Sequence, residues 1–408
     1  DTNTGELAEV EGKEAYDIKY LSAGAGKLIF AREGYLYTFD PGTGATQQVV
    51  VNVNSDNIHI RPQFKNVSTE IRNFHISPAG KRAVFEAHGE ILTVPADKGD
   101  IRNLTETPGV MERSPAWSPD GRYVAYFSDE GGEYAVHIRD QLGKEEPMRI
   151  SVDDPTFFYD SSWSPDSEKV VFSDKKANVW VADVGSRRLT LVDEMAGSPD
   201  WSPDGKWITY QKRRVNRFGV IWVFSLEDGT RHQITDGMSD AVEPIFDADG
   251  KFLFFRASTN SGMTKSGLDM TSNDHPVTYN IYITVLRNDL PSPFQPESDD
   301  EEVHVGEGDS AESVEEDSVE VPFRIDLENI GQRILALPVG DGSFNSLSSI
   351  EGGTLFYRSG SSVMKYDFTE RDSDTFLSGV SAFSVSADGK NMLYRAGRNW
   401  GIVKTSGN

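Results

Sequence analysis

Short runs of alternating apolar and polar residues recur along the chain, and no long stretch keeps a 3.6-residue period. Alternation of period two is typical of β-strands, so an all-β protein with little helix is expected. The runs come in pairs separated by a few residues. The first runs are Arg82–Ala87, Arg122–Asp129, Lys169–Asp174, Lys206–Lys212, Lys251–Ala257, Thr354–Ser359 and Asn391–Ala396. The second runs are Glu90–Pro95, Tyr134–Arg139, Asn178–Asp183, Val220–Leu226, Asn280–Leu286, Ser362–Phe368 and Trp400–Lys404, and further strands are predicted at Asp100–Thr105, Met148–Val152, Arg188–Val192 and Arg231–Thr235.

A repeated tetrapeptide precedes the first run of several pairs. Its copies are Ser118-Pro-Asp-Gly121, Ser164-Pro-Asp-Ser167 and Ser202-Pro-Asp-Gly205, which follow Trp117, Trp163 and Trp201, and looser copies begin at Ser77, Asp247 and Ser386. Pro presets φ for a turn, Asp accepts a local hydrogen bond and Gly adopts a positive φ. Each copy therefore predicts a tight turn between two strands. The aromatic residue before it is expected to pack between sheets, rather than to form a surface cage for a ligand.

The spacing of these turns predicts the fold class. Ser77, Ser118, Ser164 and Ser202 are separated by 41, 46 and 38 residues. A period near 40 with three or four short strands per repeat is typical of a β-propeller. Seven such units fit residues 58–408, one of them with its turn near Gly352-Gly353. An earlier unit, with runs Tyr16–Tyr20, Lys27–Ala31 and Gly34–Asp40, makes residues 1–52 a blade-like piece of another structure. A single eight-bladed ring is the alternative.

The fifth unit of the predicted ring is interrupted by an insertion at about residues 258–329. Within it, residues 297–320 contain twelve Asp or Glu and no Lys or Arg. Such a stretch cannot bury enough apolar surface to fold alone, so a solvated acidic loop is expected. Calcium binding or a docking tail is the alternative for this segment.

Composition excludes several classes of function. The chain of 408 residues has no Cys, which excludes disulfides, thiolate catalysis and Cys-based zinc sites. No run of 18 apolar residues is present, and the N-terminal residues lack the basic and apolar segments of a signal peptide. A net charge of −25 makes nucleic acid and anionic membranes poor partners.

No catalytic, metal or cofactor site is expected from the motifs. The chain lacks a G-x-S-x-G nucleophile elbow, and its seven His residues show no metal-binding spacing. Gly24-Ala-Gly-Lys27 lacks the remainder of a phosphate-binding loop and is read as a hairpin turn. Asp247-Ala-Asp-Gly250 begins like a calcium loop, but a strand-like run replaces the later ligands. The motifs do not exclude a Ser-His-Asp triad or a catalytic carboxylate pair whose residues come together only in the folded protein.

Several longer segments resemble one family. They are Ser77–Ala87 with Gly89–Ile91, Arg102–Thr105 with Glu112–Gly121, Ser128-Asp129 with Gly132–Tyr134, and Ile325-Asp326 with Arg333–Val339. In this order they resemble the second propeller of the tricorn protease family, over nearly the whole chain. The W-S-P-D-G repeat alone is less specific, because TolB-like proteins and prolyl-oligopeptidase-type enzymes share it.

The resemblance implies a modular serine peptidase in which a six-bladed ring precedes a seven-bladed one. Residues 1–52 would then be the last blade of the six-bladed ring. The PDZ and catalytic domains of such a peptidase would lie beyond Asn408, so no catalytic residue is carried over. The resemblance further implies a cytoplasmic location, with a periplasmic one as the alternative, and assembly into a homo-oligomer. In the family the seven-bladed ring is regarded as a channel that admits peptides.

The residues just upstream of the Trp-turn signals are the candidates for lining such a channel. They are Glu112, Arg113, Asp160, Ser198, Asp240 and Glu243. Their charges are expected to filter oligopeptides rather than to perform chemistry, although Glu112 and Arg113 have a pairing role as the alternative. A TolB-like interaction module is the second hypothesis for the chain. A propeller enzyme with its own site, such as a lyase or glycosidase, is the third.

Overall fold

The computed structural model describes residues 16–52, 54, 56, 61, 63–152, 154, 156–260, 277–296 and 323–407. Contacts between residues divide the chain into two units, Asp1–Lys65 and Asn66–Asn408. Apart from one 3₁₀ turn, the regular elements of the described residues are strands, which confirms the all-β prediction. No helix among the described residues is long and apolar enough to cross a membrane.

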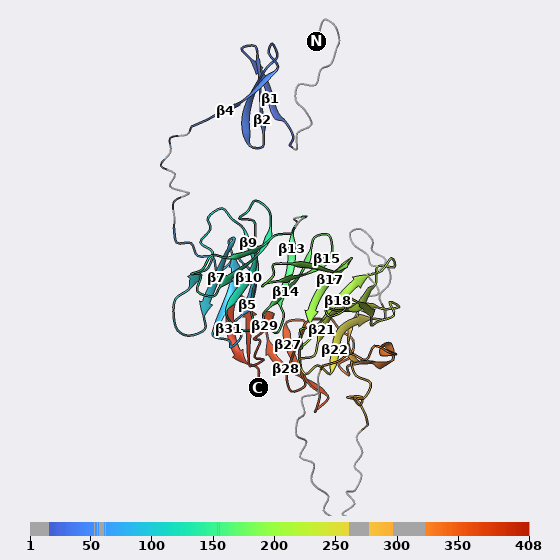
Figure 1. The fold of residues 1–408 in the computed structure, drawn as a ribbon. Coiled ribbons are helices and arrows are strands. Elements are labelled where there is room, and N and C mark those ends of the chain that lie inside the picture. The colour runs from blue at the N-terminus through green and yellow to red at the C-terminus, as the bar shows by residue number, and fades with distance from the viewer. Residues whose placement is uncertain are drawn as a thin grey trace, which may run out of the picture. The chain divides into compact units, whose positions relative to one another are not determined.

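The first unit contains one four-stranded antiparallel sheet (Figure 1). Its strands pair in sequence order: β1 (Lys19–Gly24), β2 (Lys27–Arg32), β3 (Tyr35–Asp40) and β4 (Ala45–Val49). Strand β1 begins three residues later than the predicted run from Tyr16, and β4 was not predicted. Among the described residues of this unit, Phe30 and Phe39 alone are buried. Large apolar side chains on the sheet are exposed, among them Tyr20 at 86% and Leu21 at 64%.

The described part of the second unit forms seven antiparallel sheets. The first strands of these sheets are β5 (Ile71–Ile76), β9 (Glu112–Trp117), β13 (Phe158–Trp163), β17 (Ala196–Trp201), β21 (Asp240–Phe246), β25 (Phe344–Ile350) and β29 (Val380–Val385). The second strands are β6 (Arg82–Ala87), β10 (Tyr123–Ser128), β14 (Lys169–Asp174), β18 (Trp207–Arg213), β22 (Phe252–Ser258), β26 (Thr354–Ser359) and β30 (Asn391–Ala396).

The outer strands complete each sheet. The third strands are β7 (Glu90–Pro95), β11 (Ala135–Asp140), β15 (Asn178–Asp183), β19 (Gly219–Ser225), β23 (Asn280–Val285), β27 (Ser362–Asp367) and β31 (Asn399–Lys404). The fourth strands are β8 (Arg102–Asn103), β12 (Met148–Ile150), β16 (Leu189–Glu194), β20 (Arg231–Gln233), β24 (Ile334–Ala336) and β28 (Asp372–Ser378). The seventh sheet has three strands among the described residues. A 3₁₀ turn, η2 (Ile330–Arg333), precedes β24.

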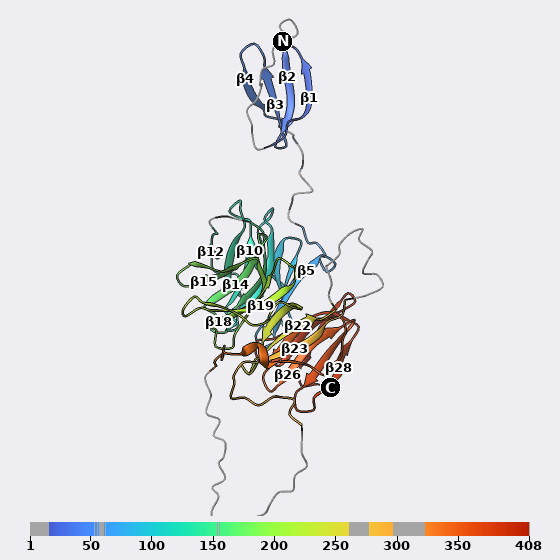
Figure 2. The same ribbon diagram turned by 90° about the vertical axis from the view of Figure 1, so that its right-hand side faces the viewer.

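The seven sheets contact one another in a closed cycle. Each first strand contacts the first strand of the next sheet, and β29 of the seventh sheet contacts β5 of the first. Seven apolar clusters lie between neighbouring sheets, and one of them joins Leu393 and Trp400 to Phe74 and Phe85 across the point of closure. In Figure 1 β5 and β29 lie side by side, and Figure 2 shows β22 and β23 beside β26. The core is therefore distributed between sheets.

The tetrapeptide turns form as predicted, with a contribution from Ser that the sequence analysis did not anticipate. The Ser118 hydroxyl donates to the Asp120 carboxylate at 2.6 Å and accepts from the backbone N–H of Tyr123 at 2.9 Å. The same two bonds form around Ser164 and Ser202. Gly121 adopts a φ of 76°, the left-handed conformation that favours glycine. The hydroxyl thus fixes the turn to the strand that follows it.

The Trp residues before these turns pack between sheets. Trp163 and Trp201 are each 6% exposed, and each lies in a cluster shared by two neighbouring sheets. Their indole N–H groups donate to the carbonyls of Ala116 and Ser162 in the preceding sheet, at 3.0 and 3.2 Å. A buried indole needs such an acceptor, so Trp163 and Trp201 join sheets by both packing and hydrogen bonding, whereas the Trp117 indole donates to the carbonyl of Gly121 in its own turn.

The strand predicted at Asn280–Leu286, inside the insertion, forms as β23 and pairs with β22 along its length. Residues 258–260, 277–296 and 323–329 of the insertion are described, and Phe323 packs against Phe246 with ring centroids 5.8 Å apart. The predicted acidic loop at residues 297–320 lies outside the described residues.

We expect Gly219→Ala to lower the free energy of unfolding by about 3 kcal/mol, a typical cost of overpacking. A Cβ at Gly219 would lie 2.2 Å from the backbone carbonyl oxygen of Ala241, so the fourth and fifth sheets would have to separate. Gly197→Ala is the matched control, because nothing lies within 4 Å of a Cβ there. Urea denaturation followed by circular dichroism measures both variants. Equal stability of the two would contradict this account of the sheet contact.

Candidate functional site

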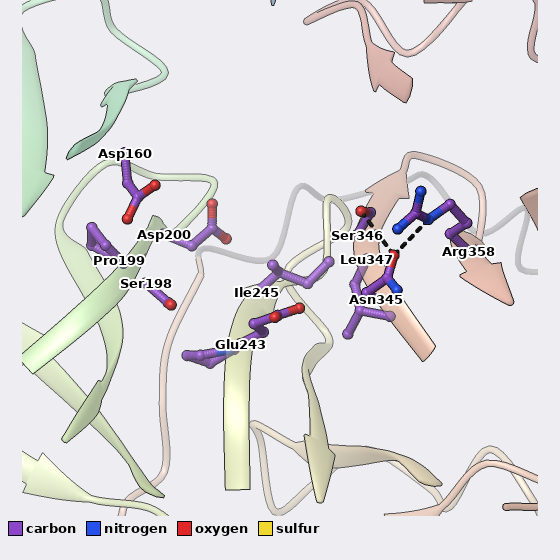
Figure 3. A pocket seen from close by; sticks show the side chains of 11 residues that line it. Asp160, Ser198, Pro199, Asp200, Glu243, Ile245, Asn345, Ser346, Leu347 and Arg358 are labelled. Carbon is purple, nitrogen blue, oxygen red and sulfur yellow. Dashed lines mark hydrogen bonds between the residues drawn. The ribbon is translucent and has the colours of Figure 1, made fainter. Parts of the chain in front are cut away.

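The first strands of four consecutive sheets surround a cavity of about 490 Å³ (Figure 3). These strands are β13, β17, β21 and β25, and β26 contributes one further side chain. The lining residues are Asp160, Ser198, Pro199, Asp200, Glu243, Pro244, Ile245, Asn345, Ser346, Leu347 and Arg358. The wall is therefore mostly polar and carries charges of both signs.

A β-bulge places four of the lining side chains. The pairing of each first strand with its second strand shifts register at the third or fourth residue of the first strand. At this position Asp160, Ser198, Glu243 and Ser346 have φ values between 51° and 55°. A bulge inserts an unpaired residue and re-aims its side chain, and a positive φ is strained for these residue types. The same backbone feature thus presents one side chain per sheet to the cavity.

Two carboxylates lie on one side of the cavity. Asp160 accepts a hydrogen bond from the hydroxyl of Ser173 at 3.2 Å, and burial raises the pKa of its carboxyl. Asp200 accepts from the backbone N–H of Phe246 at 2.8 Å, and burial raises the pKa of Asp200 to about 7. Burial penalises the charged form, and neither carboxylate forms an ion pair with a described residue. This side of the cavity favours a cationic ligand.

Arg358 lies on the opposite side of the cavity (Figure 3). Its Nε donates to Asn345 Oδ1 at 2.7 Å, and its Nη1 donates to the carbonyl of Ser381 in the seventh sheet. Among the described residues Nη2 has no hydrogen-bond acceptor. The guanidinium is therefore held in place with one donor group free.

Glu243 is neutralised by a second arginine. Arg256 forms an ion pair with Glu243 and donates from Nη1 to the carbonyl of Phe344 in the next sheet. Its guanidinium carbon lies 5.2 Å from the centroid of the Tyr279 ring. The unbalanced charges of the cavity are consequently those of Asp160, Asp200 and Arg358.

The structure brings three of the six predicted lining residues together. Asp160, Ser198 and Glu243 line the cavity. Asp240 does not line it, because its carboxylate accepts hydrogen bonds from the backbone N–H of Gly219 at 2.8 Å and from the hydroxyl of Tyr279 at 2.9 Å. These bonds give Asp240 a role in joining β21 to β19 and to Tyr279, the residue before β23.

Glu112 and Arg113 belong to β9 of the second sheet, outside this cavity, and form no ion pair with each other among the described contacts. Glu112 is 1% exposed, and its Oε1 accepts from the hydroxyl of Thr107 at 2.5 Å. Its Oε2 has no partner among the described residues, and burial raises the pKa of Glu112 to about 7. The Arg113 guanidinium stacks 3.9 Å from the centroid of the Phe157 ring.

Sequence reasoning missed Asp200, Asn345, Ser346 and Arg358. Ser346 occupies the bulge position of β25, but no Trp or Pro follows it to mark that strand. In β17 and β21 the sequence does mark the bulge, because Pro follows the bulge residue in both strands. No group of three or more His, Cys, Asp or Glu side chains in the described part of the chain is arranged to hold a metal ion.

Comparisons with known proteins agree with this architecture. A family model described as the tricorn protease second beta propeller domain matches residues 71–406. A tricorn protease homolog of Saccharolobus solfataricus is 24% identical over 93% of this chain, which spans 34% of the length of that relative. The Tol-Pal system protein TolB of Francisella tularensis is 26% identical over 67% of this chain and 62% of its own. The crystal structure of the tricorn protease superposes with a TM-score of 0.68 at 15% identity, over 99% of this chain and 40% of that one.

Proposed function

Because the chain belongs to the tricorn protease family, with its residues 71–406 matching the second β-propeller domain, we propose that it guides oligopeptides toward the catalytic region of a larger serine peptidase. In this proposal residues 66–408 form a seven-bladed ring whose axis is a peptide channel. The observation that carries the proposal is the cavity formed by first strands, into which the bulge residues Asp160, Ser198, Glu243 and Ser346 point.

The chemistry of the wall supports a peptide as the ligand. A peptide backbone offers one N–H and one C=O group per residue, and these need partners when water is displaced. Asp160, Ser198 and Ser346 supply acceptors and donors, Arg358 supplies a free N–H group, and Ile245 and Leu347 supply apolar surface. A mixed wall of this kind can hold peptides of different sequence without demanding one side chain.

The partners in this proposal are oligopeptides and the PDZ and catalytic domains of the parent peptidase. The sheet of residues 19–49 acts as a blade of a separate ring, which accounts for its exposed apolar side chains. Assembly into a homo-oligomer and a cytoplasmic location complete the proposal.

A single introduced Cys tests the channel. The chain has no Cys, so Ser198→Cys creates one site for a maleimide at the cavity wall. We expect a bulky maleimide on this residue to lower binding of a fluorescent ten-residue peptide by about tenfold or more, measured by fluorescence anisotropy. Ser186→Cys, in the exposed turn between β15 and β16, is the matched control and should bind the peptide as before. Unchanged binding after labelling at residue 198 would refute the channel.

A second candidate is a TolB-like module that binds a protein partner. The observation that favours it is the similarity to TolB, which extends over most of the length of that protein. Under this hypothesis the purified chain binds no free oligopeptide, and labelling the Cys of Ser198→Cys has no effect on capture of the partner. The labelling experiment therefore separates the two candidates.

A further inference from the structure

The charges of the cavity are separated in space. In Figure 3 Asp160 and Asp200 lie on one side and Arg358 on the other, with Ile245 and Glu243 between them. The Glu243 charge is balanced by Arg256, whereas Asp160 and Asp200 have no basic partner among the described residues. A ligand that complements this wall carries a positive group at one end and a hydrogen-bond acceptor at the other.

Both carboxylates can be reached by a cation, because Asp160 is exposed and Asp200 is half-buried. Asp160 has one hydroxyl donor, from Ser173, and Asp200 has the backbone N–H of Phe246, so both retain unused lone pairs. An ammonium group has three N–H donors and no acceptor. It can therefore donate to both carboxylates, and it offsets the cost of a charge on the desolvated Asp200.

We propose that this cavity binds the free amino terminus of a peptide, with the terminal ammonium between Asp160 and Asp200 and a following backbone carbonyl directed at Nη2 of Arg358. The inference rests on the proposed channel function and adds a substrate class to it. The volume of about 490 Å³ is in the range of sites that bury a small ligand, so the cavity holds the first residues of a peptide and leaves the remainder outside.

The side-chain ammonium of Lys has the same charge as an amino terminus but lies farther from the peptide backbone. It ends a four-carbon stem, so it cannot place a backbone carbonyl one residue away from the ammonium as an amino terminus does. Arg358 provides the donor for that carbonyl. The amino terminus satisfies both sides of the cavity, and Lys satisfies one.

Proton release accompanies binding in this proposal. The charged groups that line the cavity with Asp200 are Asp160 from β13, Glu243 from β21 and Arg358 from β26, and Arg256 of β22 pairs with Glu243. Its pKa of about 7 leaves part of the population protonated near neutral pH. An ammonium beside it favours the ionised form, so affinity rises as the pH increases through this range. It falls again when the α-amino group loses its proton near pH 8.

The experiment is a calorimetric titration of the full chain at pH 7 with three octapeptides of Ala, Gly and Ser. One has a free amino terminus, one is N-acetylated, and one is N-acetylated with a single Lys. We expect the free amino terminus to bind about tenfold tighter than either acetylated peptide, as a charged hydrogen bond implies. Titration in buffers of different ionisation enthalpy should show release of a fraction of a proton.

A double variant identifies the residues. Asp160→Asn with Asp200→Asn should reduce the preference for the free terminus over the acetylated terminus to less than about twofold. The matched control is Asp97→Asn with Asp374→Asn, two exposed residues away from the cavity, and it should retain the preference.

Four other outcomes would overturn the inference, and each leads to a different conclusion. Equal binding of free and acetylated peptides removes the amino-terminal site and leaves the channel proposal standing. Tight binding of the acetylated Lys peptide shows a general ammonium site instead. A preference that survives in the double variant assigns recognition to other residues. No binding of any peptide refutes the channel itself.

Discussion

Trp163→Ala should lower the free energy of unfolding of the second unit by about 3–5 kcal/mol, as expected for removal of a large aromatic side chain from a core. Trp163 is 6% exposed and packs in the cluster between the second and third sheets, with Phe127, Phe158 and Phe172 in the same cluster. The substitution leaves a cavity between two sheets and also leaves the Ala116 carbonyl without the indole N–H that lies 3.0 Å away.

Urea denaturation of the full chain, followed by circular dichroism, measures this effect. Trp163→Phe should cost less than Trp163→Ala, because it keeps an aromatic ring and loses mainly the hydrogen bond. Tyr159→Ala, at a side chain that is 39% exposed on the same strand, should cost under about 1 kcal/mol. A loss of similar size at Tyr159 would contradict the view that stability resides in the packing between sheets.

The second large effect concerns the two units produced separately. We expect residues 66–408 alone to fold and residues 16–52 alone to remain unfolded. The second unit has apolar clusters between all its neighbouring sheets, whereas the first buries only Phe30 and Phe39 among its described residues. A chain of fewer than about 40 residues rarely folds without a disulfide, a metal or a partner.

Circular dichroism and amide-proton NMR dispersion distinguish the outcomes. The isolated 16–52 peptide should give a random-coil spectrum with poorly dispersed amide signals. Residues 66–408 should give a β-rich spectrum and a cooperative transition in urea. A folded 16–52 peptide would contradict the role of a blade that depends on neighbours, and an unfolded 66–408 fragment would contradict the division into units.

The sequence predicted the ranges of the second and third strands of each sheet in the second unit more accurately than those of the fourth, and it gave no ranges for the first strands. The ranges of β6, β14, β26 and β30 were predicted to the residue, because a turn motif fixes where each begins and apolar alternation runs through it. Strands β24 and β28 were missed. Strand β28 has exposed or half-buried residues throughout, so no buried face imposes an apolar pattern on its sequence.

The candidate site was predicted in part for a similar reason. Asp160, Ser198 and Glu243 stand at a fixed distance before an aromatic residue and a turn, so a local pattern identifies them. Arg358 reaches the carbonyl of Ser381 in another sheet, and Asp200 receives the backbone N–H of Phe246, which is 46 positions away. Contacts between residues so distant in sequence follow from the packing of neighbouring sheets and leave no local pattern.

The bulge in the first strands provides positions at which the protein can evolve without loss of its core. The side chain at each bulge points away from the packed faces of its sheet, so replacing it removes little from the core. Asp160, Ser198, Glu243 and Ser346 are thus positions at which selection can vary the lining one blade at a time. If the channel function proposed above holds, new peptide preferences can then arise by single substitutions on an unchanged scaffold.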